Sequence, residues 1–556
     1  MIWFLLFFIV QTFSEEEEEC TLSSHCPNQL LFPEGITIIH SFSFYGCWNL
    51  TGTLNIPNSV KIIENCAFFG CSGFSGSLKI PNSVTFIGVC AFSGCFGFNG
   101  SLILSNSLSC IEGSAFSRCS GLTGTLSIPK TVKTLSSNVF SCCSNFDGLL
   151  KLHKSITVIE SYAFDGCSQF KGELKLPESI TSIDCCAFQN CFGFSGSLKM
   201  PKFITTICHS SFANCSGFSG DLIIPETVIK IDHSAFFNCS GFKGQLRIPN
   251  SITKIGFAAF SKCSGFTKSL TIPNTITVIE KETFSGCSGF EGSLRIPDSV
   301  QIIENSAFCG CSGFKGTLTL PCCMKNIGDS AFKNCSGFKG SLIIPNSVTY
   351  IGNSSFSGCS GFDGALIISE AVTTIGTSAF AGCSGFKGVL TIPNSVEIIE
   401  SFAFFGCSGF TGTLIISNFV TFIGNSTFCD CSGFTKLQIN SFHLFIGDFA
   451  FASTSFSIVS YGPELIIDCG VDVFPIDQEF DLPNSYNLSE FCGMKFGKLR
   501  KTKKRKMMLV KMGAFTAIIF SIIVAILIIF IKKLDELFNS KGKSYSSYVL
   551  IDDYQI

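Results

Sequence analysis

Phenylalanine recurs along this chain at a constant interval, with polar and small residues filling most positions between. Each Phe of the series follows the previous one by 24 residues without an insertion, and a last one follows after 23. The series is Phe44, Phe68, Phe92, Phe116, Phe140, Phe164, Phe188, Phe212, Phe236, Phe260, Phe284, Phe308, Phe332, Phe356, Phe380, Phe404, Phe428 and Phe451. Self-similarity at a period of about 20 to 50 residues predicts stacked structural repeats rather than one globular core.

The other apolar positions keep the same phase and define one repeat unit. A Cys follows three residues after each Phe up to Cys431, and a second aromatic residue or Leu follows six after. Next comes Leu-x-Ile-Pro, in which Leu342 and Ile344 face one side of a short strand and Ile343 faces the other. Pro345 ends this strand because proline lacks an amide proton. Ser-Gly and Asn-Ser pairs supply the connecting turns.

A single unit of this kind cannot bury its own apolar residues. Stacked units give each Phe, Leu, Val and Ile a like neighbour above and below. Adjacent parallel strands lie about 4.8 Å apart, so about eighteen rungs would span on the order of 85 Å. The pattern therefore predicts a long repeat solenoid.

These residues resemble the BspA-like leucine-rich-repeat family, whose units read Ile-x-Ile-Pro-x-x-Val-x-x-Ile-x-x-x-Ala-Phe-x-x-Cys. The likeness extends from about Leu31 to Phe456. It implies a leucine-rich-repeat horseshoe with a parallel β-sheet on its concave side. It also implies a surface protein, because family members are mostly surface proteins of bacteria and parasitic protists and several are adhesins. Most repeats here carry one more residue before the Leu than the units of about 23 residues that are common in the family.

The composition excludes several classes of protein. The 556 residues exceed the about 250 to 300 at which a single hydrophobic core stops growing. Apolar residues make up 46% and charged residues 14%, which excludes a disordered chain. A net charge of −2 provides no overall attraction to nucleic acid, so no nucleic-acid partner is expected.

The 32 Cys fall into a phased series and a remainder. One Cys per repeat, from Cys47 to Cys431, occupies the position three after the Phe, and we expect a buried ladder of reduced thiols there because Cys behaves as a small hydrophobic residue. Neighbouring rungs would need distortion to reach the Cβ distance of about 3.8 Å that a disulfide prefers. A zinc site needs four converging ligands, which one Cys per rung does not provide.

Cysteines outside the ladder are candidates for disulfides. A solenoid in a secreted protein must cover its open apolar ends, and two pairs of Cys lie at those ends. The predicted cap disulfides are Cys20 with Cys26 and Cys469 with Cys492. Cys66 and Cys90 share a phase on adjacent rungs and form a further candidate pair.

Both ends of the chain carry segments that do not match the repeat. The apolar start, with Thr12 and Ser14 before a cleavage point, resembles a short signal peptide. A run of twenty uncharged residues near the C-terminus is long enough to span a bilayer. The predicted order is a signal peptide at 1–14, an N-terminal cap at 15–30, repeats at 31–456, a C-terminal cap at 457–495, a basic juxtamembrane segment at 496–511, a transmembrane helix at 512–531 and a cytoplasmic tail at 532–556.

Two signals disagree on which side of the membrane the repeats face. Basic residues are concentrated in 498–511, before the span, and the positive-inside rule would place the repeats in the cytosol. A signal peptide would place them outside, and the first hydrophobic segment usually dominates. We therefore expect a single-pass plasma-membrane protein with extracellular repeats. Glycosylation sequons agree with this: the candidates are Asn49, Asn99, Asn353, Asn425 and Asn487, and Asn214, Asn238 and Asn334 match with Cys in the middle.

The tail contains a short motif with an alternative explanation. Tyr548-Val-Leu-Ile551 resembles a tyrosine-based endocytic sorting signal, which predicts an endocytic adaptor as a partner in the cytosol. The alternative is an unstructured tail without a partner.

No arrangement of residues in this sequence points to catalysis. The six His lie outside any HExxH-type motif, and no phosphate-binding or dinucleotide-binding glycine motif occurs. The Gly-rich Cys-Ser-Gly-Phe turns recur on most rungs and are therefore structural. We predict no catalytic residue, no metal, no cofactor and no enzymatic activity.

The x of Leu-x-Ile is the position where the repeats differ most informatively, because it faces away from the core. Lys79 is basic there, and a group within seven consecutive rungs consists of Lys151, Lys175, Lys199, Arg247 and Arg295. A later apolar group is Ile343, Ile367 and Ile415. The basic residues either keep the sheet soluble or contact a ligand on the extended face that repeat proteins use for binding. Adjacent exposed Ile often mark a partner site.

Two functions remain open. The first is a cell-surface binding protein, an adhesin or receptor that engages host proteins, glycans or other cells through its concave face. The second is a membrane-tethered scaffold whose repeats face the cytosol. The basic flank favours the scaffold, whereas the signal peptide, the candidate caps and the sequons favour the surface protein.

Overall fold

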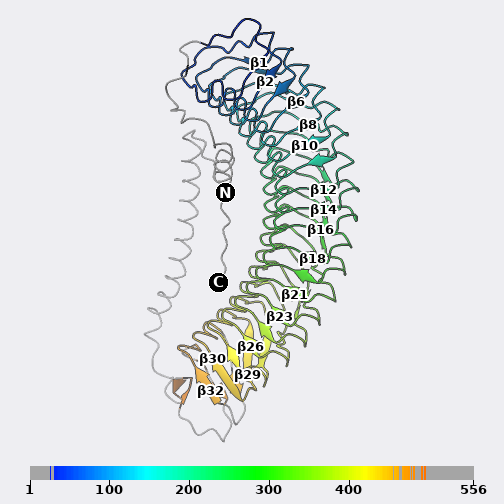
Figure 1. Cartoon of the computed structure of the whole chain (residues 1–556). Helices are drawn as coiled ribbons and strands as arrows, with labels where there is room; N and C mark the ends of the chain where they lie inside the picture. Colours follow the sequence, from blue (N-terminus) through cyan, green and yellow to red (C-terminus); the bar gives the residue numbers. More distant parts are fainter. Residues whose placement is uncertain are drawn as a thin grey trace, which may run out of the picture. The chain divides into compact units, whose positions relative to one another are not determined.

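A computed structural model describes residues 26, 30–454, 456, 458–461, 466–475, 478, 480–481, 490–492 and 494–495. The chain divides into two compact units, Met1–Asn487 and Leu488–Ile556. In the first unit the chain winds through about eighteen turns, one for each repeat of the sequence. Figure 1 shows these turns stacked on one another from β1 to β32. The prediction of a leucine-rich-repeat solenoid is confirmed.

Every described turn contributes a strand to one column of short parallel strands, and most turns contribute a strand or bridge to a second column. The Ile column, named for the Ile that ends most of its strands, consists of β1 Ile38–Ile39, β2 Ile62–Ile63, β4 Phe86–Ile87, β6 Cys110–Ile111, β8 Thr134–Leu135, β10 Val158–Ile159, β11 Ser182–Ile183, β12 Thr206–Ile207, β14 Lys230–Ile231, β16 Lys254–Ile255, β18 Val278–Ile279, β20 Ile302–Ile303, β21 Asn326–Ile327, β23 Tyr350–Ile351, β25 Thr374–Ile375, β26 Ile398–Ile399, β28 Phe422–Ile423, β30 His443–Ile446 and β32 Ile466–Cys469.

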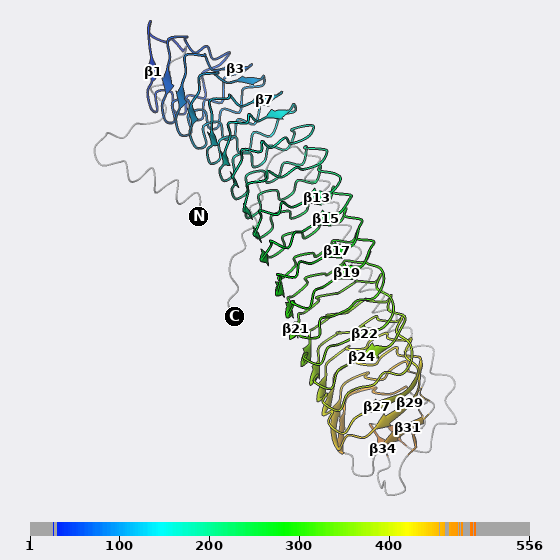
Figure 2. The ribbon, with the colours of Figure 1, turned by 90° about the vertical axis from the view of Figure 1, so that its right-hand side faces the viewer.

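The second column, the Leu column, is built on the Leu-x-Ile pattern. It consists of β3 Leu78–Lys79, β5 Leu102–Ile103, β7 Leu126–Ser127, β9 Leu150–Lys151, β13 Leu222–Ile223, β15 Leu246–Arg247, β17 Leu270–Thr271, β19 Leu294–Arg295, β22 Leu342–Ile343, β24 Leu366–Ile367, β27 Gly412–Ile416, β29 Phe434–Ile439, β31 Ile458–Tyr461 and β33 Phe480–Asp481. Figure 2 shows the columns apart, with β13, β15, β17 and β19 towards the right and β21 at the left edge.

The register between rungs equals the sequence period. Leu342 pairs with Leu366 in the Leu column, and Ile351 pairs with Ile375 in the Ile column. The expectation of one sheet is therefore incomplete, because the Val-x-x-Ile half of each unit also forms a strand. Both columns continue beyond residue 456 through β31, β32 and β33, into the range predicted as the C-terminal cap.

The core is a stack of aromatic rings. The ring of Phe236 lies parallel to those of Phe212 and Phe260, with centroids 5.6 and 5.5 Å away, and its side chain is fully buried. The second Phe of each unit forms its own stack, as in Phe242 on Phe266 at 5.5 Å. The 24-residue interval therefore places identical rings in contact, which is the reason for the Phe-rich composition.

The turns around each core Phe also pair from rung to rung. The amide of Phe236 donates to the carbonyl of Ala259 at 2.8 Å, and the amide of Asn238 donates to the carbonyl of Ser261 at 2.7 Å. Two residues that flank Phe236, Ser234 and Asn238, adopt left-handed backbone angles, with φ of 52° and 57°. Gly and Asn tolerate this conformation better than most residues, and one of them occupies the position two after the core Phe on most other rungs.

The second unit contains one described hairpin, in which β34 Glu490–Phe491 pairs antiparallel with β35 Met494–Lys495. No helix among the described residues is long and apolar enough to cross a bilayer. The predicted signal peptide at 1–14, the basic segment at 496–511, the transmembrane helix at 512–531 and the tail at 532–556 lie outside the described residues.

Candidate functional surfaces

The alternation within each Leu-column strand creates the outward surface. In β15 the Leu246 side chain is buried and Arg247 is exposed, and Pro249 follows after one residue. The same buried-exposed order holds for β3, β5, β7, β9, β13, β17, β19, β22 and β24. The position between Leu and Ile is therefore presented to solvent on successive rungs, as the sequence predicted.

The five predicted basic residues all lie exposed at this outward position. They are Lys151, Lys175, Lys199, Arg247 and Arg295. The structure does not place them all on adjacent strands, because Ile223 pairs with both Lys199 and Arg247. Thr271, which pairs with Arg295, occupies the rung after Arg247. The set therefore comprises three consecutive rungs followed by two alternate rungs.

The basic residues have few acidic partners. Arg247 lies 3.9 Å from the carboxylate of Glu226, and both side chains are more than 60% exposed, so this pair contributes little. No other ion pair in the part of the chain that the structure describes involves any of these five basic residues. Four of the five positive charges therefore face solvent without a partner carboxylate.

The predicted apolar residues are also exposed. Ile343 and Ile367 pair directly and expose 56% and 49% of their surface. Ile415 is 45% exposed, and Thr391 pairs with it from the preceding rung. Ile103 and Ile223 occupy the same outward position and are exposed to a similar degree. The exposed Ile are thus spread along the column, and only Ile343 with Ile367 forms a contiguous pair.

The Cys ladder is buried, as predicted, and it has a hydrogen-bonding role that the sequence did not reveal. From Cys71 to Cys431, each ladder thiol donates to the carbonyl oxygen of the Phe in the preceding rung, at Sγ to O distances of 2.9 to 3.1 Å. Burial raises the pKa of the Cys119 thiol to about 12. A protonated, inaccessible thiol is unsuited to nucleophilic chemistry.

The disulfide predictions need two corrections. Cys26 is bonded to Cys47, so its predicted pairing with Cys20 is wrong. Cys47 is the first residue of the phased series, and its sulfur is used in this disulfide. Cys66 and Cys90 are free thiols, so that predicted pair is also wrong.

The other predicted cap involves Cys469 and Cys492. Each of them is disulfide-bonded, and their pairing with one another stays a prediction. Cys20 lies outside the described residues.

The sequon residues differ in accessibility. Asn49, Asn99 and Asn425 are exposed, and Asn353 is half-buried. Asn214 and Asn238 belong to a ladder in which each side-chain amide donates to the Asn one rung before, at 2.8 and 3.0 Å. Asn487, Tyr548 and Ile551 lie outside the described residues.

The described residues contain no group of three or more side chains suited to holding a metal ion. His209 and His233 share a phase on adjacent rungs, and their rings meet edge to face with centroids 6.5 Å apart. Two imidazoles in this orientation complete no coordination sphere.

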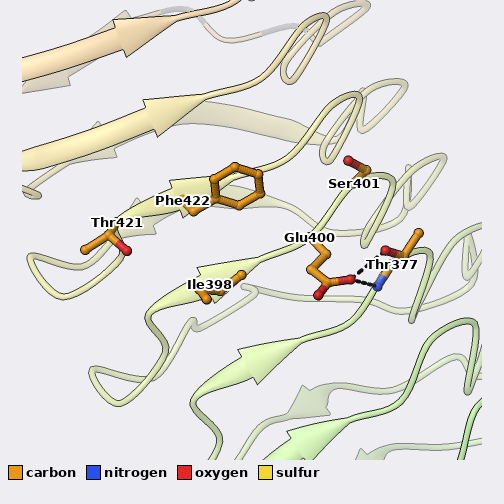
Figure 3. Close-up of a pocket in the computed structure, with 6 residues that line it drawn as sticks. All are labelled: Thr377, Ile398, Glu400, Ser401, Thr421 and Phe422. Carbon is orange, nitrogen blue, oxygen red and sulfur yellow. Dashed lines mark hydrogen bonds between the residues drawn. The ribbon is translucent and has the colours of Figure 1, made fainter.

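The sequence did not predict a pocket that lies on the Ile column. It has a volume of about 460 Å³ and is lined by Thr377, Ile398, Glu400, Ser401, Thr421 and Phe422. Figure 3 shows Glu400 reaching towards Thr377 on one side, with Ile398 and Phe422 on the other. One feature of the sequence could have indicated this pocket. The residue before the Ile of Val-x-x-Ile, which faces outward, is aromatic on only a few rungs.

Comparison with known proteins identifies the family. Residues 23–147, 148–267, 219–339, 291–385 and 364–474 match the profile of the BspA type leucine-rich repeat region. The chain belongs to the BspA-type leucine-rich-repeat family. This BspA-type protein has no match among curated proteins.

Three solved structures resemble this BspA-type protein at low identity. A leucine-rich repeat protein of Bacteroides ovatus is 23% identical over 73% of this chain and 82% of its own, with a TM-score of 0.40. A leucine-rich cell surface protein of Faecalibacterium prausnitzii is 23% identical over 62% and 86%, with a TM-score of 0.38. The pneumococcal vaccine antigen PcpA is 17% identical over 65% and 83%, with a TM-score of 0.32.

Proposed function

We propose that this chain is a cell-surface binding protein, an adhesin or receptor, that contacts an acidic extracellular protein or glycan through the Leu column. The observation that supports the proposal is the basic stripe, defined as Lys151, Lys175, Lys199, Arg247 and Arg295, five exposed cations at one outward position. Neighbouring members lie about 5 to 10 Å apart at strand spacing. That separation is comparable to the Debye length of about 8 Å at physiological salt, so their potentials add.

Each ionic contact in this attachment is weak, and the affinity comes from many contacts made at once. An exposed ion pair contributes about 0 to 1 kcal/mol, so a single cation of the stripe determines little. A polyanion meets several of them at once, and many copies of the protein on one surface add avidity. Attachment should therefore weaken as the salt concentration rises.

The test compares attachment of cells carrying the wild type or a variant with all five stripe residues changed to Ser or Thr. The matched control changes five other exposed lysines, which share the position seven after the core Phe: Lys171, Lys243, Lys315, Lys339 and Lys387. Both variants lose the same charge. Reduced attachment by the stripe variant alone supports the proposal. Equal attachment by all three, at equal surface levels, refutes the stripe and directs attention to Ile343, Ile367 and Ile415.

The alternative function is a membrane-tethered scaffold with the repeats in the cytosol. The observation in its favour is the basic run in 498–511, which precedes the predicted span. An antibody against the repeats distinguishes the two proposals. Staining of intact cells supports the surface protein, and staining only after permeabilisation supports the scaffold.

A further inference from the structure

The pocket on the Ile column combines an apolar wall with a carboxylate. Ile398 and Phe422 are direct partners in β26 and β28, so the two side chains lie side by side on the outward face. Glu400 follows Ile398 by two residues and faces the same way. Its Oε2 accepts hydrogen bonds from the amide of Thr377, at 2.9 Å, and from the Thr377 hydroxyl, at 2.5 Å (Figure 3).

These hydrogen bonds fix the Glu400 side chain and leave one of its oxygens available. Among the described residues no donor reaches Oε1 of Glu400, whereas Oε2 has two. The hydroxyls of Ser401 and Thr421 add polar groups to the lining. The pocket, of about 460 Å³, is open to solvent, so a ligand would lie along the outward face of the column.

The same arrangement occurs a second time near the other end of the solenoid. Ile62 pairs with Phe86, and Glu64 follows Ile62 by two residues. Oε2 of Glu64 accepts the amide of Ser41 at 2.9 Å and its hydroxyl at 3.3 Å. It also lies 3.4 Å from Nδ1 of His40, whereas Gly376 occupies the corresponding position before Glu400. Thr85 precedes Phe86 as Thr421 precedes Phe422. Glu64 and Glu400 are separated by 336 residues, which is fourteen repeats of 24.

The two sites are distinguished by the Phe beside the Glu, because the hydrogen bonds of the Glu also occur elsewhere. Glu160 makes the same two bonds to Ser137, both at 2.9 Å, but the outward residue on the next rung is Ser182. Two other outward aromatic residues, Tyr350 and Phe445, have no Glu beside them. Gly328 and Gly424 occupy the positions that correspond to Glu400. On the described rungs, Ile, Glu and Phe meet only at these two places.

The chemistry of the lining indicates the class of ligand. A ring face and an Ile suit a flat apolar surface, and the polarised C–H groups on one face of a pyranose ring are attracted to the electron-rich face of Phe. The hydroxyls at the edge of such a sugar would donate to Oε1 of the Glu. A lipid tail would cover Oε1 of that carboxylate without offering it a hydrogen-bond donor, which is costly. An acidic sugar would be repelled by it.

We propose that the Ile398–Glu400–Phe422 pocket and its second copy, Ile62–Glu64–Phe86, each bind one neutral pyranose unit of a glycan. This proposal does not depend on the basic stripe, which lies on the other column and suits anions. The two sites are about 65 Å apart along the column at strand spacing. A long neutral polysaccharide can therefore meet both sites on one molecule, and a short oligosaccharide only one.

The test measures binding of the purified full-length chain to cellotriose, chitotriose and a heparin tetrasaccharide. We expect the two neutral probes to bind and Phe86→Ala with Phe422→Ala to lower their affinity at least tenfold. Phe86→Trp with Phe422→Trp keeps a ring face and should retain binding, which separates recognition from misfolding. Tyr350→Ala, at the same outward position beside Gly328, is the matched control and should change nothing.

The carboxylate is tested in the same way. Glu64→Gln with Glu400→Gln should weaken binding of the neutral probes, whereas Glu160→Gln, which removes one such carboxylate beside Ser182, should not. The proposal is overturned if neither cellotriose nor chitotriose binds, or if their binding survives Phe86→Ala with Phe422→Ala. Binding of the heparin tetrasaccharide alone would also overturn it, and loss of that binding in the stripe variant would assign it to the Leu column.

Discussion

The thiol of Cys239 donates a hydrogen bond to the carbonyl oxygen of Phe212, at an Sγ to O distance of 3.0 Å. The same oxygen accepts the amide of Cys215 at 3.2 Å, so both of its lone pairs are used. Cys is therefore favoured at the ladder position for two reasons. It is small and apolar enough to be buried, and it donates to a carbonyl that no backbone amide of the next rung reaches.

Replacing Cys239 with Ala should destabilise the solenoid by about 1 to 3 kcal/mol, because the second lone pair of the Phe212 carbonyl loses its donor in a dry environment. Cys239→Ser keeps a donor and should cost less. Urea unfolding of the full-length variants measures the difference. If Ala and Ser cost the same, the hydrogen bond contributes nothing and only the volume of the sulfur matters.

The ladder thiols should resist labelling in the folded protein. Cys239 and Cys335 are fully buried, whereas Cys142, Cys322 and Cys323 are exposed. Maleimide should modify the exposed three quickly and the ladder only after denaturation, which peptide mass spectrometry resolves by position. Rapid modification of Cys335 without denaturant would contradict a closed stack.

Stability should fall as the pH rises above 9. Burial raises the pKa of the Cys119 and Cys263 thiols from 9.0 to about 12. Between these values the unfolded chain releases protons that the folded ladder retains, so the unfolded state binds fewer protons and becomes favoured. The expected loss is about 1.4 kcal/mol per pH unit for each such thiol.

The control for this pH dependence removes the groups responsible. Urea midpoints measured between pH 8 and pH 11 should fall less steeply for Cys119→Ala with Cys263→Ala than for the wild type. Cys322→Ala, which removes an exposed thiol, is the matched comparison. An unchanged slope in the double variant would show that Cys119 and Cys263 do not contribute to the effect.

Replacing Phe236 with Ala should cost about 3 to 5 kcal/mol, because it removes a fully buried ring between two stacked neighbours. The matched control is the adjacent Phe237, which is half-buried. Lys262 Nζ lies 5.1 Å from the centroid of its ring. Phe237→Ala should cost about 1 kcal/mol. Hydrogen exchange of the surrounding rungs measures both, and equal protection in the two variants would contradict a core role for the Phe236 stack.

The repeat, the Phe core and the outward position of Leu-x-Ile could all be predicted from the sequence. An interval of 24 residues requires that Phe212, Phe236 and Phe260 contact one another, whatever the detailed path of the turns. Period-two alternation in Leu-x-Ile likewise placed Leu246 inside and Arg247 outside without knowledge of any neighbour. These properties follow from the spacing of residues along the chain, so a single sequence is sufficient to predict them.

Contacts between side chains at different positions of the repeat became clear only from the tertiary structure. Cys26 is bonded to Cys47 rather than to Cys20. Glu400 accepts a hydrogen bond from Thr377 in a pocket that Phe422 also lines. Such contacts depend on the path of the turns and on a second strand in each unit. Hydrophobic spacing does not encode them, because a Glu or a Cys on a turn satisfies the repeat equally well with any partner.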